Sequence, residues 1–180
     1  VAVFSAAVGL GVAFPSVNSG GVKAAQTPAI APVAVPNEGP RFTGTARIVD
    51  GDTLALGATK IRLHGIDAPE MSPTCNDTHG AEWTCGKWSK AALERLAVGP
   101  VTCVQNDIDR YERVVGTCFA QGINLNAAMV AKGAAFAYVK YARDYVAQET
   151  QARRMAAGMW RSGVQNPSDY RAEKRAATQT

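Results

Sequence analysis

The sequence contains no CxxC pair, and its two histidines, His64 and His79, have no second histidine at ligand spacing. Structural zinc sites are usually built from closely spaced cysteines and histidines, so a zinc centre is a weak alternative here. Each histidine is better interpreted as a polar surface residue than as a metal ligand or proton carrier. No internal repeat is apparent, which argues against a repeat architecture.

The apolar, uncharged segment 1–14 is shorter than the roughly 20 residues that a membrane-spanning helix needs. It resembles the apolar part of an export signal, and Val22-Lys23-Ala24 offers a weak cleavage site. A fragment of an uncleaved membrane anchor is the alternative. We expect residues 1–24 to be this remnant and residues 25–40, with a proline at every fourth position, to be an extended linker.

The rest of the chain is long enough for one globular domain, which we expect over residues 41–163. Residues 164–180 are polar, basic and poorly patterned, and we expect this tail to be frayed or disordered. The formal charge of +4 and the pI near 9.0 suit a polyanionic partner but are common in unrelated proteins.

Short apolar segments with alternating character predict strands, and longer segments bounded by glycine predict helices. One strand is expected to end at Ile48-Val49, and four more are expected at 53–56, 60–63, 101–104 and 114–119. Helices are expected at 78–98, from Asn124 or Gly122 to 132, and at 144–160. This order favours an α+β domain, and five short strands with an intervening helix fit a small closed barrel.

Four cysteines permit three pairings. Cys75 and Cys85 flank one short loop, whereas Cys103 and Cys118 lie in two apolar runs separated by a polar loop. Because neighbouring antiparallel strands would bring the second pair together, we expect disulfides Cys75–Cys85 and Cys103–Cys118. Disulfides agree with export, whereas free thiols in a cytosolic enzyme remain the alternative if the N-terminal interpretation is wrong.

Acidic and basic side chains gather at the ends of two expected strands between Arg47 and Glu70. Asp52 ends a turn, and the period of two in the following hairpin places Arg62 on the face where Asp52 could also point. Asp67 then opens the loop that ends at Glu70.

Asp52, Asp67 and Glu70 offer only oxygen donors, which hard cations such as calcium and magnesium prefer. A divalent ion with an arginine beside it suits phosphate chemistry, and one carboxylate is left to accept a proton from water. The alternative is that these aspartates merely form turns.

These residues resemble the core of the staphylococcal nuclease (thermonuclease) family, and the similarity continues to about Trp160. The second half of the family pattern places an arginine in a D-x-Y-G-R loop, where this chain has Asp109-Arg110-Tyr111-Glu112-Arg113. The segment from Leu125 to Gly133 resembles the family's next helix, and Gly158-Met159-Trp160 resembles the end of its last helix. The resemblance implies an OB-fold, a five-stranded β-barrel, here with three α-helices.

By this resemblance, Asp52 and Asp67 would bind one calcium ion, assisted by the backbone carbonyl of Ala68. Glu70 would orient or deprotonate the attacking water. These roles suit the chemistry, because a phosphodiester gains negative charge in the transition state and nearby cations oppose it.

The resemblance also implies that Arg62 and Arg113 grip the scissile phosphate. Tyrosines would contact the bound nucleotide, namely Tyr111, Tyr138 and Tyr141. For Tyr138 and Tyr141, simple packing is the alternative.

Three departures from the family pattern stand out. Ala68 replaces a threonine of which only the backbone oxygen is needed. Glu112 replaces the glycine before Arg113, which adds a negative charge and stiffens the loop. The loop between Glu70 and the first helix carries Cys75, Asp77 and His79 instead of a lysine-rich run, which makes the substrate groove less positive. We expect activity to persist.

The sequence thus predicts an exported, calcium-dependent endonuclease that cuts DNA and RNA with little sequence specificity and leaves 3′-phosphates, as the family resemblance implies. We expect a monomer without a stable protein partner, and membrane attachment only through an uncleaved anchor. One alternative is a non-catalytic nucleic-acid or protein-binding OB module, which would be expected to lack carboxylates or arginines that are all present here. Another is a cell-surface structural domain without metal dependence.

Overall fold

A computed structural model describes residues 39–71, 75–77 and 79–178 of the chain. Apart from residues 39 and 40, the expected signal and linker segments lie outside this part. The first strand begins at Arg41, where we expected folded structure to start. Among the described residues, no helix is both long and apolar enough to cross a bilayer.

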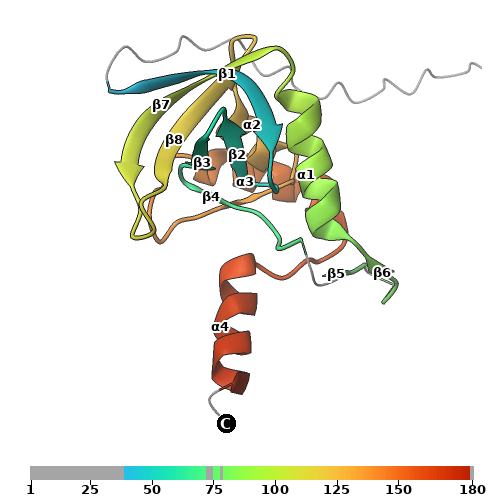
Figure 1. Cartoon of the computed structure of the whole chain (residues 1–180). Helices are drawn as coiled ribbons and strands as arrows, with labels where there is room; N and C mark the ends of the chain where they lie inside the picture. The colour runs from blue at the N-terminus through green and yellow to red at the C-terminus, as the bar shows by residue number, and fades with distance from the viewer. Residues whose placement is uncertain (1–38, 72–74, 78, 179–180) are drawn as a thin grey trace, which may run out of the picture.

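Five strands form a closed barrel, which confirms the α+β fold class and the barrel (Figure 1). They are β1 (Arg41–Ile48), β2 (Thr53–Leu56), β3 (Thr59–Leu63), β7 (Pro100–Ile108) and β8 (Val114–Ala120). The strand order is β3-β2-β1-β7-β8, with β9 (Ile123–Asn124) beyond β8. A parallel pairing of β3 with β8 closes the sheet on itself, so β3 is hydrogen-bonded along both edges.

The apolar residues that alternate along these strands point into the barrel and form its core. Leu54, Ile61, Leu63 and Val101 have at most 1% of their surface exposed. Two short strands, β4 (Ile66–Asp67) and β10 (Phe136–Ala137), pair with each other in a small separate sheet.

The described part of the chain contains four α-helices instead of the three expected. They are α1 (Cys85–Leu96), α2 (Leu125–Ala131), α3 (Val146–Arg154) and α4 (Pro167–Thr178), and a 3-10 turn, η1 (Gly158–Arg161), follows α3.

Helix α1 starts at Cys85, seven residues later than the predicted range 78–98. The chain before it forms a small hairpin of β5 (Cys75–Asn76) and β6 (Glu82–Trp83). The Asp77 carboxylate accepts hydrogen bonds from the backbone N–H groups of His79 (2.8 Å) and Ala81 (2.9 Å). A side chain that bonds its own backbone in this way favours a turn over a helix.

The predicted helix 144–160 is divided into α3 and η1. Gly158 has a φ of +53°, and a β-carbon there would lie 2.4 Å from the carbonyl oxygen of Lys132. The chain therefore turns at a position that only glycine fits.

Helix α4 differs from the expected disordered tail. The Asn166 side chain accepts a hydrogen bond from the backbone N–H of Ser168 (2.9 Å), and Pro167 occupies the first helical position. Both features favour a helix start. In Figure 1, α4 extends away from the barrel, with its first turn nearest the domain.

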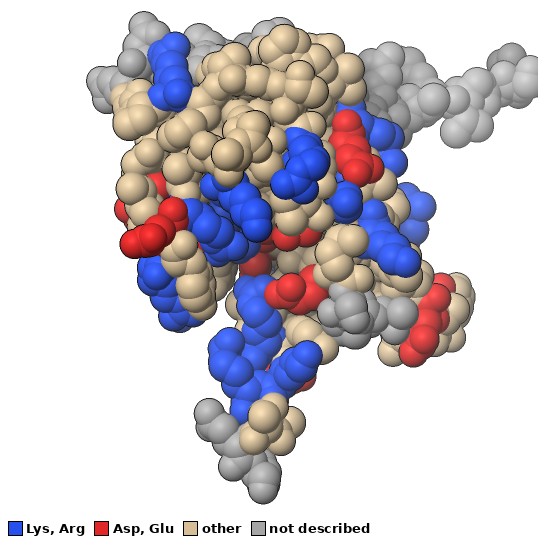
Figure 2. Space-filling model, viewed as in Figure 1, with Lys and Arg blue, Asp and Glu red and all other residues tan. Residues whose placement is uncertain are grey.

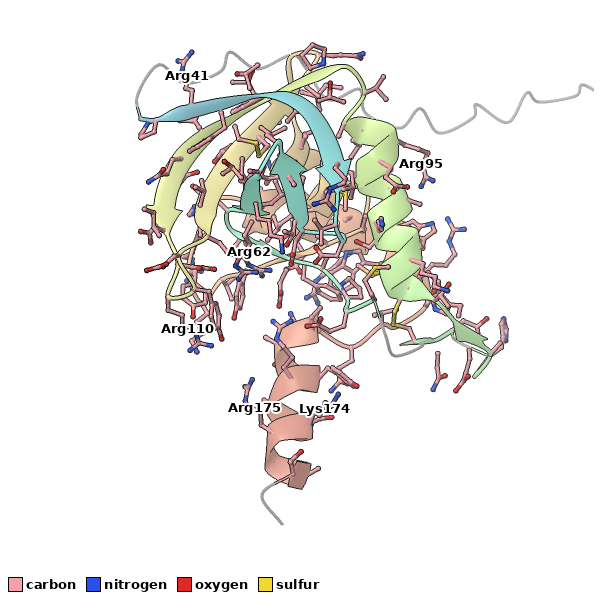
Figure 3. The ribbon with its side chains drawn as sticks, viewed as in Figure 1. Arg41, Arg62, Arg95, Arg110, Lys174 and Arg175 are labelled. Atoms are coloured by element: carbon pink, nitrogen blue, oxygen red, sulfur yellow. A yellow bond between two sulfur atoms is a disulfide. The ribbon has the colours of Figure 1, made fainter. Side chains whose placement is uncertain are left out.

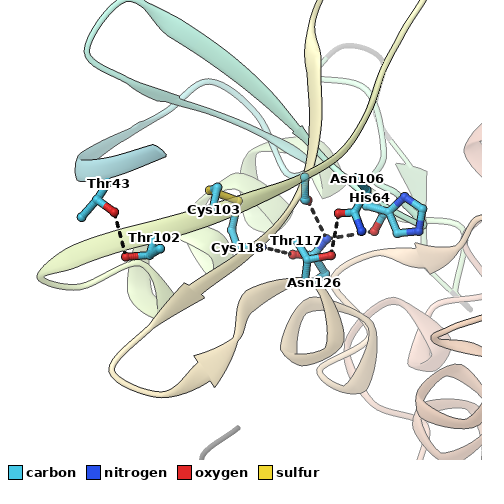
Figure 4. The surroundings of a disulfide bond; sticks show 9 residues. Thr43, His64, Thr102, Cys103, Asn106, Thr117, Cys118 and Asn126 are labelled. Carbon is cyan, nitrogen blue, oxygen red and sulfur yellow. Dashed lines mark hydrogen bonds between the residues drawn. A yellow bond between two sulfur atoms is a disulfide. The ribbon is translucent and has the colours of Figure 1, made fainter. Parts of the chain in front are cut away.

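The structure contains both predicted disulfides, Cys75–Cys85 and Cys103–Cys118. Cys103 and Cys118 are directly opposed in the antiparallel pairing of β7 with β8, and both are fully buried (Figure 4). Cys75–Cys85 ties the β5–β6 hairpin to the start of α1.

A buried amide links the barrel to α2 (Figure 4). The Asn126 side chain donates hydrogen bonds to the carbonyls of His64 (2.9 Å) and Gly116 (3.2 Å) and accepts one from the Cys118 N–H (3.0 Å). It therefore joins the end of β3 and the middle of β8 to the helix.

We expect Asn126→Ala to lower the free energy of unfolding by about 2 to 3 kcal/mol, because it leaves buried backbone groups without partners. Chemical denaturation measures this. The matched control is Asn124→Ala, which removes the hydrogen bond that the α2 N-cap accepts from the Ala127 N–H and a hydrogen bond with Tyr145, and should cost about 1 kcal/mol. Equal losses in the two variants would contradict the role of Asn126.

Candidate functional site

Asp52 is held in place by a tight turn before β2. The Asp50 carboxylate accepts a hydrogen bond from the Asp52 N–H (3.0 Å). A β-carbon on Gly51 would lie 2.0 Å from the Ser89 hydroxyl oxygen, so this turn packs directly on α1. The Asp52 side chain is consequently buried, with 5% of the residue exposed.

Arg62 joins two buried carboxylates. The register of β2 with β3 places Arg62 opposite Thr53, next to Asp52. Its Nη1 lies 2.7 Å from Asp52 Oδ1, and its Nη2 lies 3.0 Å from Asp67 Oδ1. Figure 3 shows Arg62 at the end of the barrel that faces α4. The structure thus brings together the three residues that the sequence indicated.

Asp67 is positioned by the pairing of β4 with β10, in which it lies opposite Phe136. Only 1% of Asp67 is exposed. The next residue, Ala68, is also buried, and its backbone N–H donates to Asp52 Oδ2 (3.0 Å). The two aspartates are therefore connected twice, through Arg62 and through the backbone of Ala68.

Glu70 lies at the rim of the site with 46% of its side chain exposed. It contacts Arg171, a residue of α4 that the sequence analysis did not identify. Arg171 Nη1 lies 2.9 Å from Glu70 Oε1, and its Nη2 lies 2.5 Å from Asp67 Oδ2. No local pattern pointed to Arg171, because it lies about a hundred residues away in a segment expected to be disordered.

The electrostatics reflect negative charge placed away from water. Burial raises the pKa of Asp67 above its ordinary value, even though Arg171 and Arg62 act in the opposite direction. Burial and the neighbouring Asp52 carboxylate raise the pKa of Asp50 to about 6. Burial alone would lower the pKa of Arg62, but the attraction of Asp52 and Asp67 outweighs it and raises the pKa.

Arg113 is held by its own loop between β7 and β8. Its Nε and Nη2 both lie 2.7 Å from Asp109 Oδ2, and 34% of its side chain is exposed. The hydrogen bonds and ion pairs of the described residues do not connect Arg113 to the carboxylates around Arg62. Of the two predicted phosphate-binding arginines, Arg62 therefore lies with the carboxylates, whereas Arg113 lies in the loop between β7 and β8.

The same loop explains the glycine of the family pattern. Glu112 has a φ of +60°, its N–H donates to the Asp109 carbonyl (2.9 Å), and the Asp109 N–H donates to the Arg113 carbonyl (3.0 Å). This is a three-residue hairpin loop whose last position is left-handed, which glycine adopts without strain.

The three tyrosines that were predicted to contact substrate form two groups. The Tyr138 and Tyr141 rings pack edge to face with centroids 4.8 Å apart, and Tyr141 is exposed. Tyr111 is also exposed, with Arg110 4.8 Å and Arg113 5.5 Å from its ring centroid.

The histidines do not belong to this site. His64 Nε2 lies 3.4 Å from the Asp144 carboxylate, and His79 is exposed on the β5–β6 hairpin. Figure 2 shows Lys and Arg side chains around a small group of Asp and Glu side chains where α4 meets the rest of the domain.

The donor set fits a hard cation, because Asp52 and Asp67 are buried, adjacent and supply oxygen only. Within the described ranges, no three His, Cys, Asp or Glu side chains are close enough together to form a metal cage by themselves. An ion held by the two aspartates would need further oxygen ligands from backbone, water or substrate. Arg171 already shows that a positive group fits against Asp67.

Comparison with known proteins gives a consistent result. A family model described as staphylococcal nuclease homologue matches residues 60–162, which include Arg62, Asp67, Glu70 and Arg113. The chain is similar to an uncharacterized endonuclease of Escherichia coli, with 35% identity over 122 residues covering 63% of this chain and 73% of that protein. It is also similar to a micrococcal nuclease of Shigella flexneri, with 31% identity over 154 residues covering 73% and 81% respectively.

A further relative is named for a different process. The succinoglycan biosynthesis protein ExoI of Rhizobium meliloti is 36% identical over 126 residues, which cover 66% of this chain and 64% of the relative. This chain thus spans just under two thirds of that protein's length.

We expect Arg62→Ala to lower the free energy of unfolding by about 3 kcal/mol in the presence of a chelator, because it leaves two buried carboxylates without their shared partner. Urea denaturation measures this. Arg113→Ala is the matched control, since it removes a partly exposed pair and should cost about 1 kcal/mol or less. A similar loss of unfolding free energy in both variants would show that the Arg62 bridge stabilises the fold no more than the Arg113 pair does.

Glu112→Gly should raise the free energy of unfolding by about 0.5 to 1 kcal/mol, because relief of the left-handed strain outweighs the entropy that glycine gains in the unfolded chain. Thermal denaturation measures the gain. Glu112→Gln removes the charge but keeps the β-carbon, so it should give no gain. An equal gain from Gln would assign the effect to charge instead of backbone strain.

Proposed function

Because this chain belongs to the family of staphylococcal nuclease homologues, we propose that it is a calcium-dependent endonuclease that hydrolyses phosphodiester bonds in DNA and RNA. The observation that carries the proposal is the pair of buried aspartates fixed by Arg62, with Glu70 at the solvent-facing rim. In this arrangement a cation site, a phosphate-binding group and a base lie next to one another.

Arg62 would bind the scissile phosphate. Two carboxylates hold its guanidinium from one side, so its orientation is set before substrate arrives. Groups that are fixed in advance stabilise the extra negative charge of a transition state without the cost of rearrangement. Arg62 is also 21% exposed, which leaves part of the side chain accessible to a phosphate oxygen.

Glu70 would act as the base. Its exposed carboxylate can accept a proton from a water molecule, whose oxygen then bonds to phosphorus. The bond from phosphorus to the 5′ oxygen breaks, the leaving oxygen takes up a proton, and the product keeps a 3′-phosphate. We assign that last proton to solvent, because an arginine holds its protons too tightly to be a good donor.

Asp52, Asp67 and the Ala68 carbonyl would hold the calcium ion. When bound, the ion would supply positive charge opposite the phosphate oxygens. The support for this assignment is the oxygen-only donor set and its burial, which favours a compensating positive charge.

Arg113 and the tyrosines would contact the rest of the substrate. Asp109 binds the Nε and Nη2 atoms of Arg113, which leaves Nη1 to meet a phosphate oxygen. The exposed rings of Tyr111 and Tyr141, and the partly exposed ring of Tyr138 beside Tyr141, offer surfaces on which bases can stack without sequence preference.

The protein would act outside the reducing cytosol. Two disulfides in one small domain are typical of exported proteins. In this proposal residues 1–24 direct or anchor the chain, residues 25–40 are a tether, residues 41–163 form the nuclease domain and residues 164–180 add α4. The domain would work as a monomer without a stable protein partner.

The test is hydrolysis of heat-denatured DNA by the full chain, with calcium and then with a chelator. We expect chelation to abolish cleavage and Glu70→Gln to reduce kcat at least about 100-fold, whereas Arg62→Ala should lose about 100-fold to 1000-fold. Glu94→Gln, an isosteric change on the exposed face of α1, should leave the rate unchanged. Labelled product ends report whether the phosphate stays on the 3′ side.

Binding of DNA without cleavage under any divalent ion would contradict the proposal and favour a non-catalytic OB module. Cleavage that survives in Glu70→Gln would instead remove Glu70 from the base role.

A further inference from the structure

Arg171 of α4 binds the two carboxylates that the proposed mechanism needs free. Its guanidinium contacts Asp67 Oδ2 (2.5 Å) and Glu70 Oε1 (2.9 Å) with two different nitrogens. Such two-pronged contacts between arginine and carboxylates are among the strongest hydrogen bonds in proteins. Burial alone would lower the pKa of Arg171, yet these bonds raise it.

The position of Arg171 is set by the way α4 is attached to the domain. Val164 is buried in a cluster with Cys85, Phe136 and Met159, and Pro167 at the start of α4 is buried as well. Arg171 follows Pro167 by four residues, so the two share one face of the helix. The buried first turn therefore directs Arg171 to the carboxylates, while the later turns of α4 extend away from the barrel (Figure 1).

Every carboxylate oxygen of the two aspartates already accepts a hydrogen bond. Asp52 Oδ1 accepts from Thr53 and Arg62, and Asp52 Oδ2 accepts from the backbone of Ala68. Asp67 Oδ1 accepts from Arg62, and Asp67 Oδ2 accepts from Arg171. A cation that enters this site must compete with one of these donors.

Arg171 is the donor that can withdraw at the lowest cost. Arg62 belongs to β3, which is hydrogen-bonded along both edges, and the N–H of Ala68 is part of a buried loop. Arg171 instead lies on α4, in which Pro167 is the buried residue, with 28% of its side chain exposed, and its departure breaks no strand pairing. Segments with few buried apolar contacts open most easily.

We propose that α4 is an intramolecular competitor of the activating cation: Arg171 occupies the carboxylates of the ion-free protein and withdraws when the cation binds. This inference rests on the proposed function, because it takes Asp67 as a cation ligand and Glu70 as the base. Only molecules in which α4 is undocked can bind the cation, so the apparent dissociation constant equals the intrinsic one divided by the undocked fraction. Arg171 would thus set the cation concentration at which the enzyme becomes active.

The first measurement is calcium binding to the full chain by calorimetry. We expect Arg171→Ala to bind calcium about tenfold more tightly than the wild type, which corresponds to about nine in ten molecules being docked. Arg171→Lys keeps the charge but loses the two-pronged contact, so its affinity should lie between the two. Lys174→Ala removes the same charge one turn further along α4, and the affinity should stay within about twofold of wild type.

Unchanged affinity in Arg171→Ala would overturn the competition. An equal gain in Lys174→Ala would also overturn it, because the effect would then come from the general charge of α4.

The second measurement is hydrogen exchange of α4 in the wild type. Addition of calcium should speed the exchange of its backbone amides, since the helix loses the Arg171 contacts, and should have no such effect in Arg171→Ala. If calcium binds and the exchange of these amides stays constant, α4 does not withdraw and the proposal is wrong.

These outcomes separate the inference from the proposed function. If the wild type binds calcium and cuts DNA while Arg171→Ala behaves identically, only the role of Arg171 fails. If neither protein binds calcium, the two aspartates form no cation site and both proposals fail.

Discussion

The Arg62 bridge between Asp52 and Asp67 is the interaction on which the rest of the site depends. Two carboxylates with almost no exposed surface would repel each other and lose their hydration if left alone. The barrel makes their burial possible by placing the arginine on β3, a strand that is fixed on both sides. The backbone N–H of Ala68 then donates to the other oxygen of Asp52, and the Thr53 hydroxyl donates to the same oxygen as Arg62. Stability of the domain and readiness of the site are therefore linked, because the same contacts serve both.

Much of this arrangement could be predicted because it is encoded locally. Alternation in β3 predicted which face Arg62 occupies, and the turn that ends at Asp52 predicted that this carboxylate could point to the same face. The disulfides followed from strand neighbours and loop length. The start of α1 was missed, since apolar and helix-favouring residues continue into a segment that the Asp77 turn and the Cys75–Cys85 bridge force into a hairpin.

Long-range contacts could not be predicted in this way. Arg171 meets Glu70 across a sequence separation of 101 residues, and nothing in the composition of the tail indicated a partner. Asn126 likewise contacts His64 from 62 residues away. The helix that carries Arg171 does have a local signal, the Asn166-Pro167 start, but its polar composition hid that signal within a segment that was expected to be disordered. Arg113 shows the reverse case, because its loop was identified while its bond to Asp109 was not.

The closed barrel also determines which parts of this domain tolerate substitution. Because β3 is hydrogen-bonded to both β2 and β8, substitutions near Arg62 disturb the core. Helix α4 and the loop from Asp109 to Arg113 lie outside the barrel's own hydrogen-bond ladders. Both can accept changes in length and charge without altering the frame. Helix α4 and this loop are therefore two places at which the rim of the site can be redesigned while the buried centre around Arg62 is kept.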